Sequence, residues 1–202
     1  MYKEQSLSIK DITQAGIFTA LTAIGAFISI PIGPVPITLQ SFFVLLSGIF
    51  LGSKKALFSQ ITYLLLGLIG FPIFAGFSGG IQSIFKPSFG FIIGYVASAY
   101  VVGKLTETKT SSHIVLWTAV LTGTLTIYAF GLPYMYYSLN IMLSSNLSVF
   151  KILQLGMLSF IPGDLLKAII AVFLAKKLKG MPGGHAGHAG DGPLSSKGPS
   201  PE

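Results

Sequence analysis

Long apolar runs, separated by short segments that carry most of the lysines, dominate this chain of 202 residues. Several of the runs approach the roughly 20 residues that an α-helix needs to cross a bilayer. Only 9% of the residues are charged, against roughly 25% in a typical soluble domain, and the mean hydropathy is +0.75. Such runs exceed what the core of a soluble protein of this size needs. The sequence therefore predicts an all-α integral membrane protein.

Glycine, proline and lysine divide the apolar sequence into six segments. We expect membrane-spanning helices at about residues 15–30, 38–51, 56–70, 89–103, 114–130 and 162–175. A signal peptide is the alternative for the first segment, but that segment is long and lacks a clear small-residue cleavage site. Small residues at four-residue spacing, such as Gly90, Gly94 and Ser98, predict close contacts between helices because they let two backbones approach.

The connecting segments differ in composition. Residues 31–37 and 71–88 are dense in proline and glycine, which predicts a short lid or re-entrant loop and a loop folded against the bundle. Residues 131–161 carry three tyrosines and several polar side chains, which favours one or two short helices at the membrane interface. We expect residues 1–179 to form one six-helix transmembrane domain. Residues 180–202, rich in Gly, Pro and Ser, are expected to be a disordered tail or a cloning remnant.

Every basic residue of the chain is a lysine, and the net charge is +7. With a cytoplasmic N-terminus, six spans place most of the lysines inside. The inner set is Lys3, Lys10, Lys54, Lys55, Lys104, Lys109, Lys176, Lys177 and Lys179. The outer loops carry only Lys86 and Lys151, so the asymmetry predicts that both termini are cytoplasmic. The lysines are not clustered with aromatic residues, which argues against nucleic acid as a partner.

Asp164 and Lys167 lie inside the last apolar run. A charge at membrane depth costs several kcal/mol unless it is paired or faces a cavity, so such residues indicate a functional site. Their spacing puts both on one face of a helix. We expect Pro162 and Gly163 to open that helix and to place Asp164 in its first turn, near free N–H groups. The alternative is that the pair only orients the helix.

No catalytic constellation is found in the sequence, because the spans hold one carboxylate and no cysteine. A metal site or a resident cofactor is not expected, and without a phosphate-binding loop the chain cannot hydrolyse ATP by itself. Recognition of a small molecule is the function that remains to be considered. Asp164 can accept two N–H donors, Lys167 can donate to an oxygen, and the Phe- and Tyr-rich loops can enclose a ring.

Four stretches occur in order along residues 9–179: IPIGPVPITLQ (30–40), GLIGFPIFAGFSGG (67–80), residues 87–94 and FIPGDLLKAIIA (160–171). Together they resemble the BioY family of biotin-specific substrate-capture subunits, the S components of energy-coupling-factor transporters. The resemblance implies a six-helix S-component fold and a biotin site near the outer face. It also implies as partners a transmembrane coupling subunit and two ATPases, in a prokaryotic cell membrane.

By the same resemblance, Asp164 and Lys167 match the acidic and basic residues that contact the ligand. Further candidate ligand-binding residues are Gln40, Ser78, Gln82, Lys86, Phe91 and Tyr95. Lys86 stands where the family pattern has a glycine-rich stretch, and it could attract the carboxylate of biotin; a snorkelling surface lysine is the alternative. The small-residue face of the first helix implies a surface for the coupling subunit, here Gly16, Thr19, Ala20 and Ala23.

The preferred function is therefore capture of biotin for ATP-driven uptake, with the protein acting as a transporter subunit rather than an enzyme. Three alternatives remain open. The same scaffold could bind another small vitamin, a proton-coupled transporter could use Asp164 and Lys167 as a switch, or the chain could be a structural membrane protein. The absence of an inverted repeat counts against the second of these. A homo-oligomer is also left open.

Overall fold

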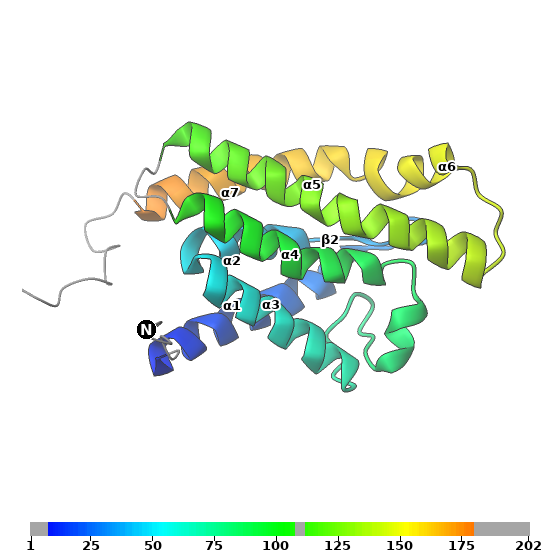
Figure 1. Cartoon of the computed structure of the whole chain (residues 1–202), viewed down its shortest axis with the longest axis horizontal. Coiled ribbons are helices and arrows are strands. Elements are labelled where there is room, and N and C mark those ends of the chain that lie inside the picture. The colour runs from blue at the N-terminus through cyan, green and yellow to red at the C-terminus, as the bar shows by residue number, and fades with distance from the viewer. Residues whose placement is uncertain (1–7, 108–111, 180–202) are drawn as a thin grey trace, which may run out of the picture.

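The structure is a computed structural model that describes residues 8–107 and 112–179, and this part of the chain is mostly helical (Figure 1). The helices are α1 (Ile9–Phe27), α2 (Gln40–Leu51), α3 (Ser53–Leu68), α4 (Phe89–Thr106), α5 (His113–Tyr137), α6 (Val149–Leu153) and α7 (Ile161–Lys179). An antiparallel hairpin, β1 (Ser29–Ile30) and β2 (Ile37–Thr38), joins α1 to α2. The shorter helical pieces are η1 (Ile81–Phe85), η2 (Ser138–Met142) and η3 (Gln154–Leu158). The tail expected at 180–202 lies outside the described residues.

The described residues form six helical rods, because η2 extends α5 while α6, η3 and α7 follow one another along a single rod (Figure 1). In the part of the chain that the structure describes, three rods are long and apolar enough to cross a membrane by themselves, namely 89–106, 113–142 and 149–178. The apolar helix α2 is shorter. The predicted all-α membrane fold with six helices is confirmed.

Glycines bring α4 and α5 into close contact, as their spacing predicted. A Cβ atom at Gly94 would lie 2.9 Å from the carbonyl oxygen of Ile127. A Cβ atom at Gly90 would lie 2.2 Å from the Cβ of Tyr134. Neither site has room for a larger residue, so these glycines set the distance between the helices that later supply much of the candidate site.

The loop between α3 and η1 is folded against the bundle, as predicted. Phe74, only 2% exposed, reaches the helix surface at Gly67, where a Cβ atom would lie 2.0 Å from its ring. The Tyr63 hydroxyl donates to the Ile73 carbonyl at 2.9 Å, and the Tyr63 and Phe74 rings meet edge to face. A hydrogen bond to the loop backbone and the packing of the Phe74 ring together hold this loop over the end of α3.

The prediction for residues 131–161 is wrong in its central point. Helix α5 does not end near Phe130 but continues through Pro133, and the last rod begins at Val149 rather than at Pro162. A proline inside a helix removes one backbone hydrogen bond. Here the helix continues beyond Pro133 because tertiary contacts stabilise it. Tyr134 fits over Gly90 and its hydroxyl donates to the Ile84 carbonyl. These contacts keep the segment helical where local sequence favours a break.

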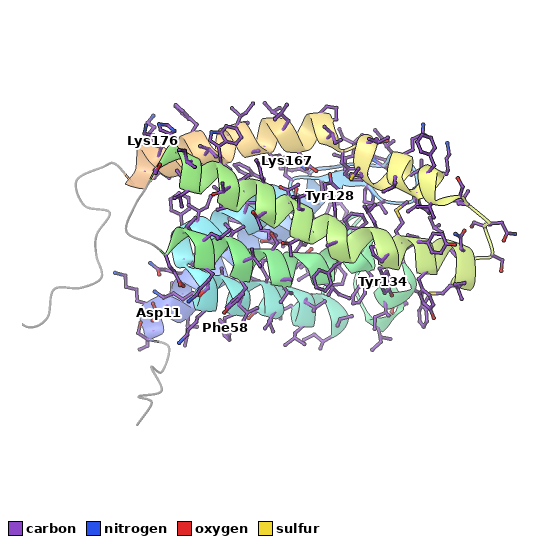
Figure 2. The ribbon with its side chains drawn as sticks, turned by 45° about the horizontal axis from the view of Figure 1, so that its top comes forward. Asp11, Phe58, Tyr128, Tyr134, Lys167 and Lys176 are labelled. Atoms are coloured by element: carbon purple, nitrogen blue, oxygen red, sulfur yellow. The ribbon has the colours of Figure 1, made fainter. Side chains whose placement is uncertain are left out.

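Both ends of the described chain lie at the same end of the bundle, together with the α2–α3 junction and the end of α4 (Figure 1). Polar contacts join the elements there. Lys55 forms an ion pair with Asp11, and the Glu107 carboxylate accepts from the Ser53 backbone N–H at 2.8 Å. Figure 2 shows Asp11 and Lys176 at this end. The lysine-rich segments of the sequence therefore meet at one side of the molecule.

Candidate functional site

The two charged residues of the last helix form a direct pair in the interior. Lys167 Nζ lies 3.0 Å from Asp164 Oδ1 and donates to Ser41 Oγ of α2 at 3.1 Å. The Tyr128 hydroxyl of α5 donates to Asp164 Oδ2. Lys167 and Tyr128 both lie midway along the bundle in Figure 2. The pair thus links three helices, α2, α5 and α7.

Because the pair is largely buried, the loss of either partner should lower the stability of the protein. Lys167 is 7% exposed, and removing one member of a buried ion pair typically costs about 3–5 kcal/mol because the other charge is left uncompensated. Asp164 lies in the first turn of α7, as predicted. Its backbone N–H, however, donates to the Phe160 carbonyl at 2.9 Å, because α6 and η3 continue the rod before it. Side chains, not free N–H groups, therefore stabilise the carboxylate.

Two cavities lie side by side and share a wall made of Val35, Pro36, Phe91 and Tyr95, and the second of them is lined by this pair. The first is also lined by Gln40, Phe74, Ala75, Ser78, Ser83, Lys86, Ser88 and Ile92. The second is also lined by Thr38, Ser41, Thr124, Ile127, Tyr128, Phe160, Asp164 and Lys167. Each has a volume of about 30 Å³, room for one or two water molecules. They lie on either side of this shared wall, with Lys86 lining the first cavity and the ion pair lining the second.

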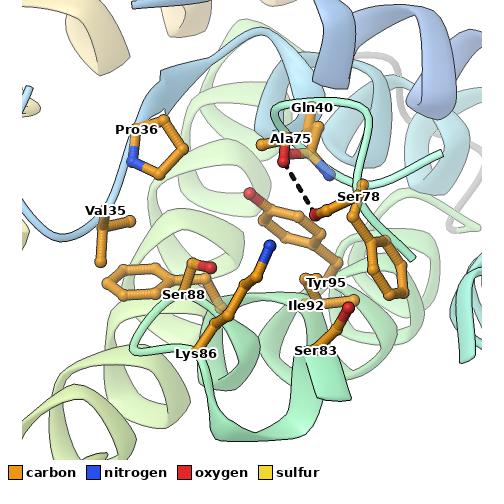
Figure 3. Close-up of a pocket in the computed structure, with 12 residues that line it drawn as sticks. Val35, Pro36, Gln40, Ala75, Ser78, Ser83, Lys86, Ser88, Ile92 and Tyr95 are labelled. Carbon is orange, nitrogen blue, oxygen red and sulfur yellow. Dashed lines mark hydrogen bonds between the residues drawn. The ribbon is translucent and has the colours of Figure 1, made fainter. Parts of the chain in front are cut away.

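Lys86 points into the middle of the first cavity, between Ser88 and Tyr95 (Figure 3). Ser78, on the opposite side, donates to the Ala75 carbonyl at 3.0 Å within its own loop (Figure 3). The Ser83 hydroxyl is different: Ser83 is 2% exposed, and its Oγ has no hydrogen-bond partner in the described part of the chain. A buried hydroxyl in the wall of a cavity can serve a ligand at no cost in broken protein contacts.

The structure brings seven of the eight predicted ligand-binding residues to these cavities, namely Gln40, Ser78, Lys86, Phe91, Tyr95, Asp164 and Lys167. The eighth, Gln82, is exposed, lines neither cavity, and donates back to the Gly79 carbonyl at 2.6 Å. Gln40 is in place but engaged, because its Nε2 donates to the Tyr63 hydroxyl at 2.6 Å and its Oε1 accepts from Thr38 at 3.0 Å. Its role here is to connect the hairpin to α3.

Aromatic rings separate the two cavities. Phe91 stacks on Phe160 with the ring centres 6.3 Å apart and meets Tyr128 edge on at 6.5 Å. Offset and edge-to-face pairs of this kind favour a fixed arrangement of the rings. Apolar faces beside a carboxylate and an ammonium suit a small ring with polar edges. Among the described residues, no three His, Cys, Asp or Glu side chains come together, so this part of the chain offers no metal cluster.

Of the four residues of α1 expected to meet a coupling subunit, two are buried and two are exposed. Thr19 and Ala23 are buried, and the Thr19 hydroxyl donates to the Ser59 carbonyl at 2.9 Å. The Thr19 contact holds α1 to α3, and because both side chains are buried, neither is open to a partner. Gly16 and Ala20 are exposed, and no atom lies within 4 Å of a Cβ placed at Gly16.

Comparison with known proteins identifies the family to which this chain belongs. A model of the BioY family matches residues 1–182. The biotin transporter BioY of Thermotoga maritima is 41% identical over 171 residues, 85% of this chain and 96% of that protein. This chain belongs to the BioY family. A second relative, a probable biotin transporter BioY of Pyrococcus horikoshii, is 40% identical over 174 residues, 86% of this chain and 99% of that protein.

A solved structure supports the BioY assignment at the level of the fold. A crystal structure of the S-component for biotin from an ECF-type ABC transporter matches with a TM-score of 0.75 and 31% identity. The match covers 91% of this chain and 96% of that chain. The S-component fold inferred from the four sequence stretches is confirmed, and a role in transport rather than catalysis is the property of the BioY family.

The sequence did not reveal the residues that complete the site around the BioY ion pair. Tyr128 lies within an apolar span, where a tyrosine usually packs by its ring, so nothing in the sequence marked it as a partner of Asp164. Ser41 follows Gln40 directly, and its position at the start of a helix was the available signal. No sequence pattern pointed to Ser83.

Proposed function

We propose that this chain captures biotin at the two adjoining cavities and presents it for ATP-driven uptake, as the substrate-binding subunit of an energy-coupling-factor transporter. The observation that carries the proposal is the buried Asp164–Lys167 pair in the wall of a cavity with aromatic sides. The names of its relatives, which are biotin transporters, support the same ligand.

The ion pair complements the cyclic urea of biotin. That ring carries two N–H donors and one carbonyl oxygen, which match the carboxylate of Asp164 and the ammonium of Lys167. Each carboxylate oxygen can accept more than one hydrogen bond, so Asp164 can keep Tyr128 and Lys167 while it accepts from the ligand. Charge-assisted hydrogen bonds of this type are about twice as strong as neutral ones.

The first cavity suits the carboxylate tail of biotin. Lys86 is the basic residue of the first cavity, and Ser83 and Ser88 add hydroxyl donors there. The tail would run past Phe91 and Tyr95, which line both cavities. The ligand would thus span both cavities, with its ring on the last helix and its tail near the start of α4.

A vitamin is larger than either cavity, since ligand pockets usually hold roughly 300 Å³ or more. Binding therefore requires the covering segments to move. Residues 31–37 and 71–88 border the first cavity and connect rigid helices, so opening and reclosing of these segments would admit the ligand and then enclose it. The ligand must favour the closed state for this step to occur.

Transport needs partners because the chain has no ATP-binding motif. We place a transmembrane coupling subunit and two ATPases beside it, with Gly16 and Ala20 on the exposed side of α1 as the docking position. The lysine distribution favours both termini in the cytoplasm, and the organisms of this chain's relatives, Thermotoga maritima and Pyrococcus horikoshii, support a prokaryotic cell membrane. Residues 1–179 would act as one binding domain, as a monomer or a homo-oligomer within the complex.

The first test measures ligand choice and energy source. Purified protein in lipid nanodiscs is expected to bind biotin below micromolar concentration and to prefer it over other vitamins in competition. Failure to bind at that level would reject biotin as the ligand, and stronger binding of another vitamin would show the same scaffold with different specificity. Biotin uptake that persists without ATPases and stops when the proton gradient is removed would instead show a secondary transporter.

The second test concerns Lys86. Replacement Lys86→Gln is expected to weaken biotin binding about fivefold, the effect of an exposed charge pair worth about 1 kcal/mol. Binding of the uncharged biotin amide should not change. Lys151→Gln is the matched control, since Lys151 is exposed and lines neither cavity. Equal losses for biotin and its amide would show that Lys86 does not contact the carboxylate.

A further inference from the structure

A third cavity lies on the outer surface of the bundle, between the hairpin and α7, with α2 at its base. Its volume is about 360 Å³, well above that of either ligand cavity. Ile28, Ile30 and Ile37 line one side, Leu166 and Ile170 the other, and Phe42 the base. We refer to it as the lateral groove.

Among the described residues, the polar side chains that line the lateral groove already have hydrogen-bond partners. Thr38 and Lys167 are its polar lining residues, and both have their polar atoms engaged elsewhere. Lys167 Nζ donates to Asp164 and Ser41, and the Thr38 hydroxyl donates to Gln40 Oε1. Burying a polar ligand here would leave its hydrogen bonds unmade, which is unfavourable. The groove therefore selects a hydrocarbon.

The surroundings of the groove specify where that hydrocarbon comes from. Its α7 side belongs to the rod 149–178, which is long enough to cross the membrane, so the groove opens toward lipid rather than water. Leu166 and Ile30 are each 59% exposed at its rim. A partner helix, about 10 Å across with its side chains, would cover an extended face rather than fill a cavity of this size. An acyl chain is the hydrocarbon that the bilayer supplies.

The lateral groove and the ligand cavity share a wall. Thr38 and Lys167 line both, so the stem of Lys167 faces the groove while its ammonium faces the proposed urea site. An occupied groove would restrict the stem and keep the ammonium on Asp164 and Ser41. An unoccupied groove leaves the stem without contacts on that side.

We propose that the lateral groove binds one acyl chain of a membrane lipid and that this chain supports Lys167 in the ligand-binding position. The binding of an acyl chain rests on the groove alone. The support of Lys167 for ligand binding rests on the proposed biotin function. The consequence is that ligand affinity depends on lipid, although the lipid does not touch the ligand.

Gly163 provides a direct test because it lines the groove and no atom lies within 4 Å of a Cβ placed there. Gly163→Leu should fill the groove without a clash and should favour the helix. Gly16→Leu is the matched control, a helical glycine with equally open space on α1, outside the groove. Gly163→Ala is a smaller change, expected to have an intermediate effect, and guards against a folding defect of the leucine variant.

The first readout uses phosphatidylcholine with a diazirine near the end of its acyl chain, without biotin, and maps the crosslinks by mass spectrometry. Labelling of residues 28–42 and 163–170 should saturate in the wild type and in Gly16→Leu. It should fall about fivefold or more in Gly163→Leu, as for loss of a site worth about 1 kcal/mol. Labelling that does not saturate, that survives Gly163→Leu, or that is replaced by contact with a second copy or a coupling subunit would overturn the proposal.

The second readout is biotin affinity before and after delipidation in detergent. The wild type and Gly16→Leu should lose about fivefold in affinity when lipid is removed and regain it when lipid is returned. Gly163→Leu should lose little, because the leucine replaces the chain. If affinity is independent of lipid while labelling saturates, the support of Lys167 is rejected. If no variant binds biotin but labelling behaves as expected, the proposed function fails and the lipid site stands.

Discussion

Replacement of Asp164 by Asn is expected to weaken biotin binding about 100-fold, or nearly 3 kcal/mol. The change keeps the size of the side chain but removes its charge. It also replaces one acceptor oxygen by an NH₂ group that faces the donors of Tyr128 or Lys167. The urea N–H groups would then lose a charge-assisted acceptor. Isothermal titration calorimetry of the protein in nanodiscs measures the loss.

A second effect must be separated from this one. Asp164→Asn leaves the ammonium of Lys167 buried with Ser41 as its partner, which should also lower thermal stability. The double variant Asp164→Asn/Lys167→Met removes the uncompensated charge and should restore much of the stability without restoring biotin binding. Tyr128→Phe keeps the carboxylate charge and should cost far less affinity than Asp164→Asn.

The outcome distinguishes the functions that the sequence left open. A structural protein predicts lower stability of Asp164→Asn with no ligand affinity to lose. A pair that only orients the helix predicts that the double variant recovers binding together with stability. Either result would contradict the role of Asp164 in ligand recognition.

Replacement of Gly94 by Leu is expected to give the largest loss of stability, at least about 3 kcal/mol, together with loss of ligand binding. A Cβ atom at Gly94 would lie 2.9 Å from the carbonyl oxygen and 3.0 Å from the Cα of Ile127. Both are backbone atoms of α5, so no rotamer change can relieve the contact and the helices must separate. Phe91 and Tyr95 of α4 would then move away from Tyr128 of α5.

Gly16→Leu tests whether this loss comes from helix contact rather than from the substitution itself. Gly16 is also a helical glycine, but no atom lies within 4 Å of its Cβ position. Its leucine variant should unfold at the temperature of the wild type or slightly above. Thermal unfolding in detergent, followed by circular dichroism, compares the two. Similar losses for both variants would show that α4 and α5 are not held together as the structure indicates.

The fold class and much of the site could be predicted from sequence because each depends on local features. Six apolar segments predicted six helical rods, and Gly90 and Gly94 predicted a close helix contact, since hydrophobicity and residue size act over a few residues. Asp164 and Lys167 were recognisable because charge is rare at membrane depth. The four stretches that resemble the BioY family carried the identity of the ligand, which the physical pattern alone left as a small polar ring.

The course of residues 131–161 could not be predicted, because Pro133 and three tyrosines favour a break locally. Helix α5 continues there through contacts with residues more than 40 positions earlier in the chain, namely Gly90 and Ile84 with Tyr134. Because α6 and η3 continue the rod before α7, the Asp164 carboxylate meets the side chains of Tyr128 and Lys167 rather than free backbone N–H groups.

The sequence by itself determined that this chain is a membrane-embedded helical bundle with a charge pair inside it. The free energy of moving apolar and charged groups from water into the membrane depends on the composition of each segment, which can be read from the sequence. Only the tertiary structure decided which side chains bind that pair and which residues separate the two cavities. It also decided that Thr19 and Ala23 face inward while Gly16 and Ala20 do not. Those outcomes depend on the rotation and spacing of whole helices, which are set by contacts between residues distant in the chain.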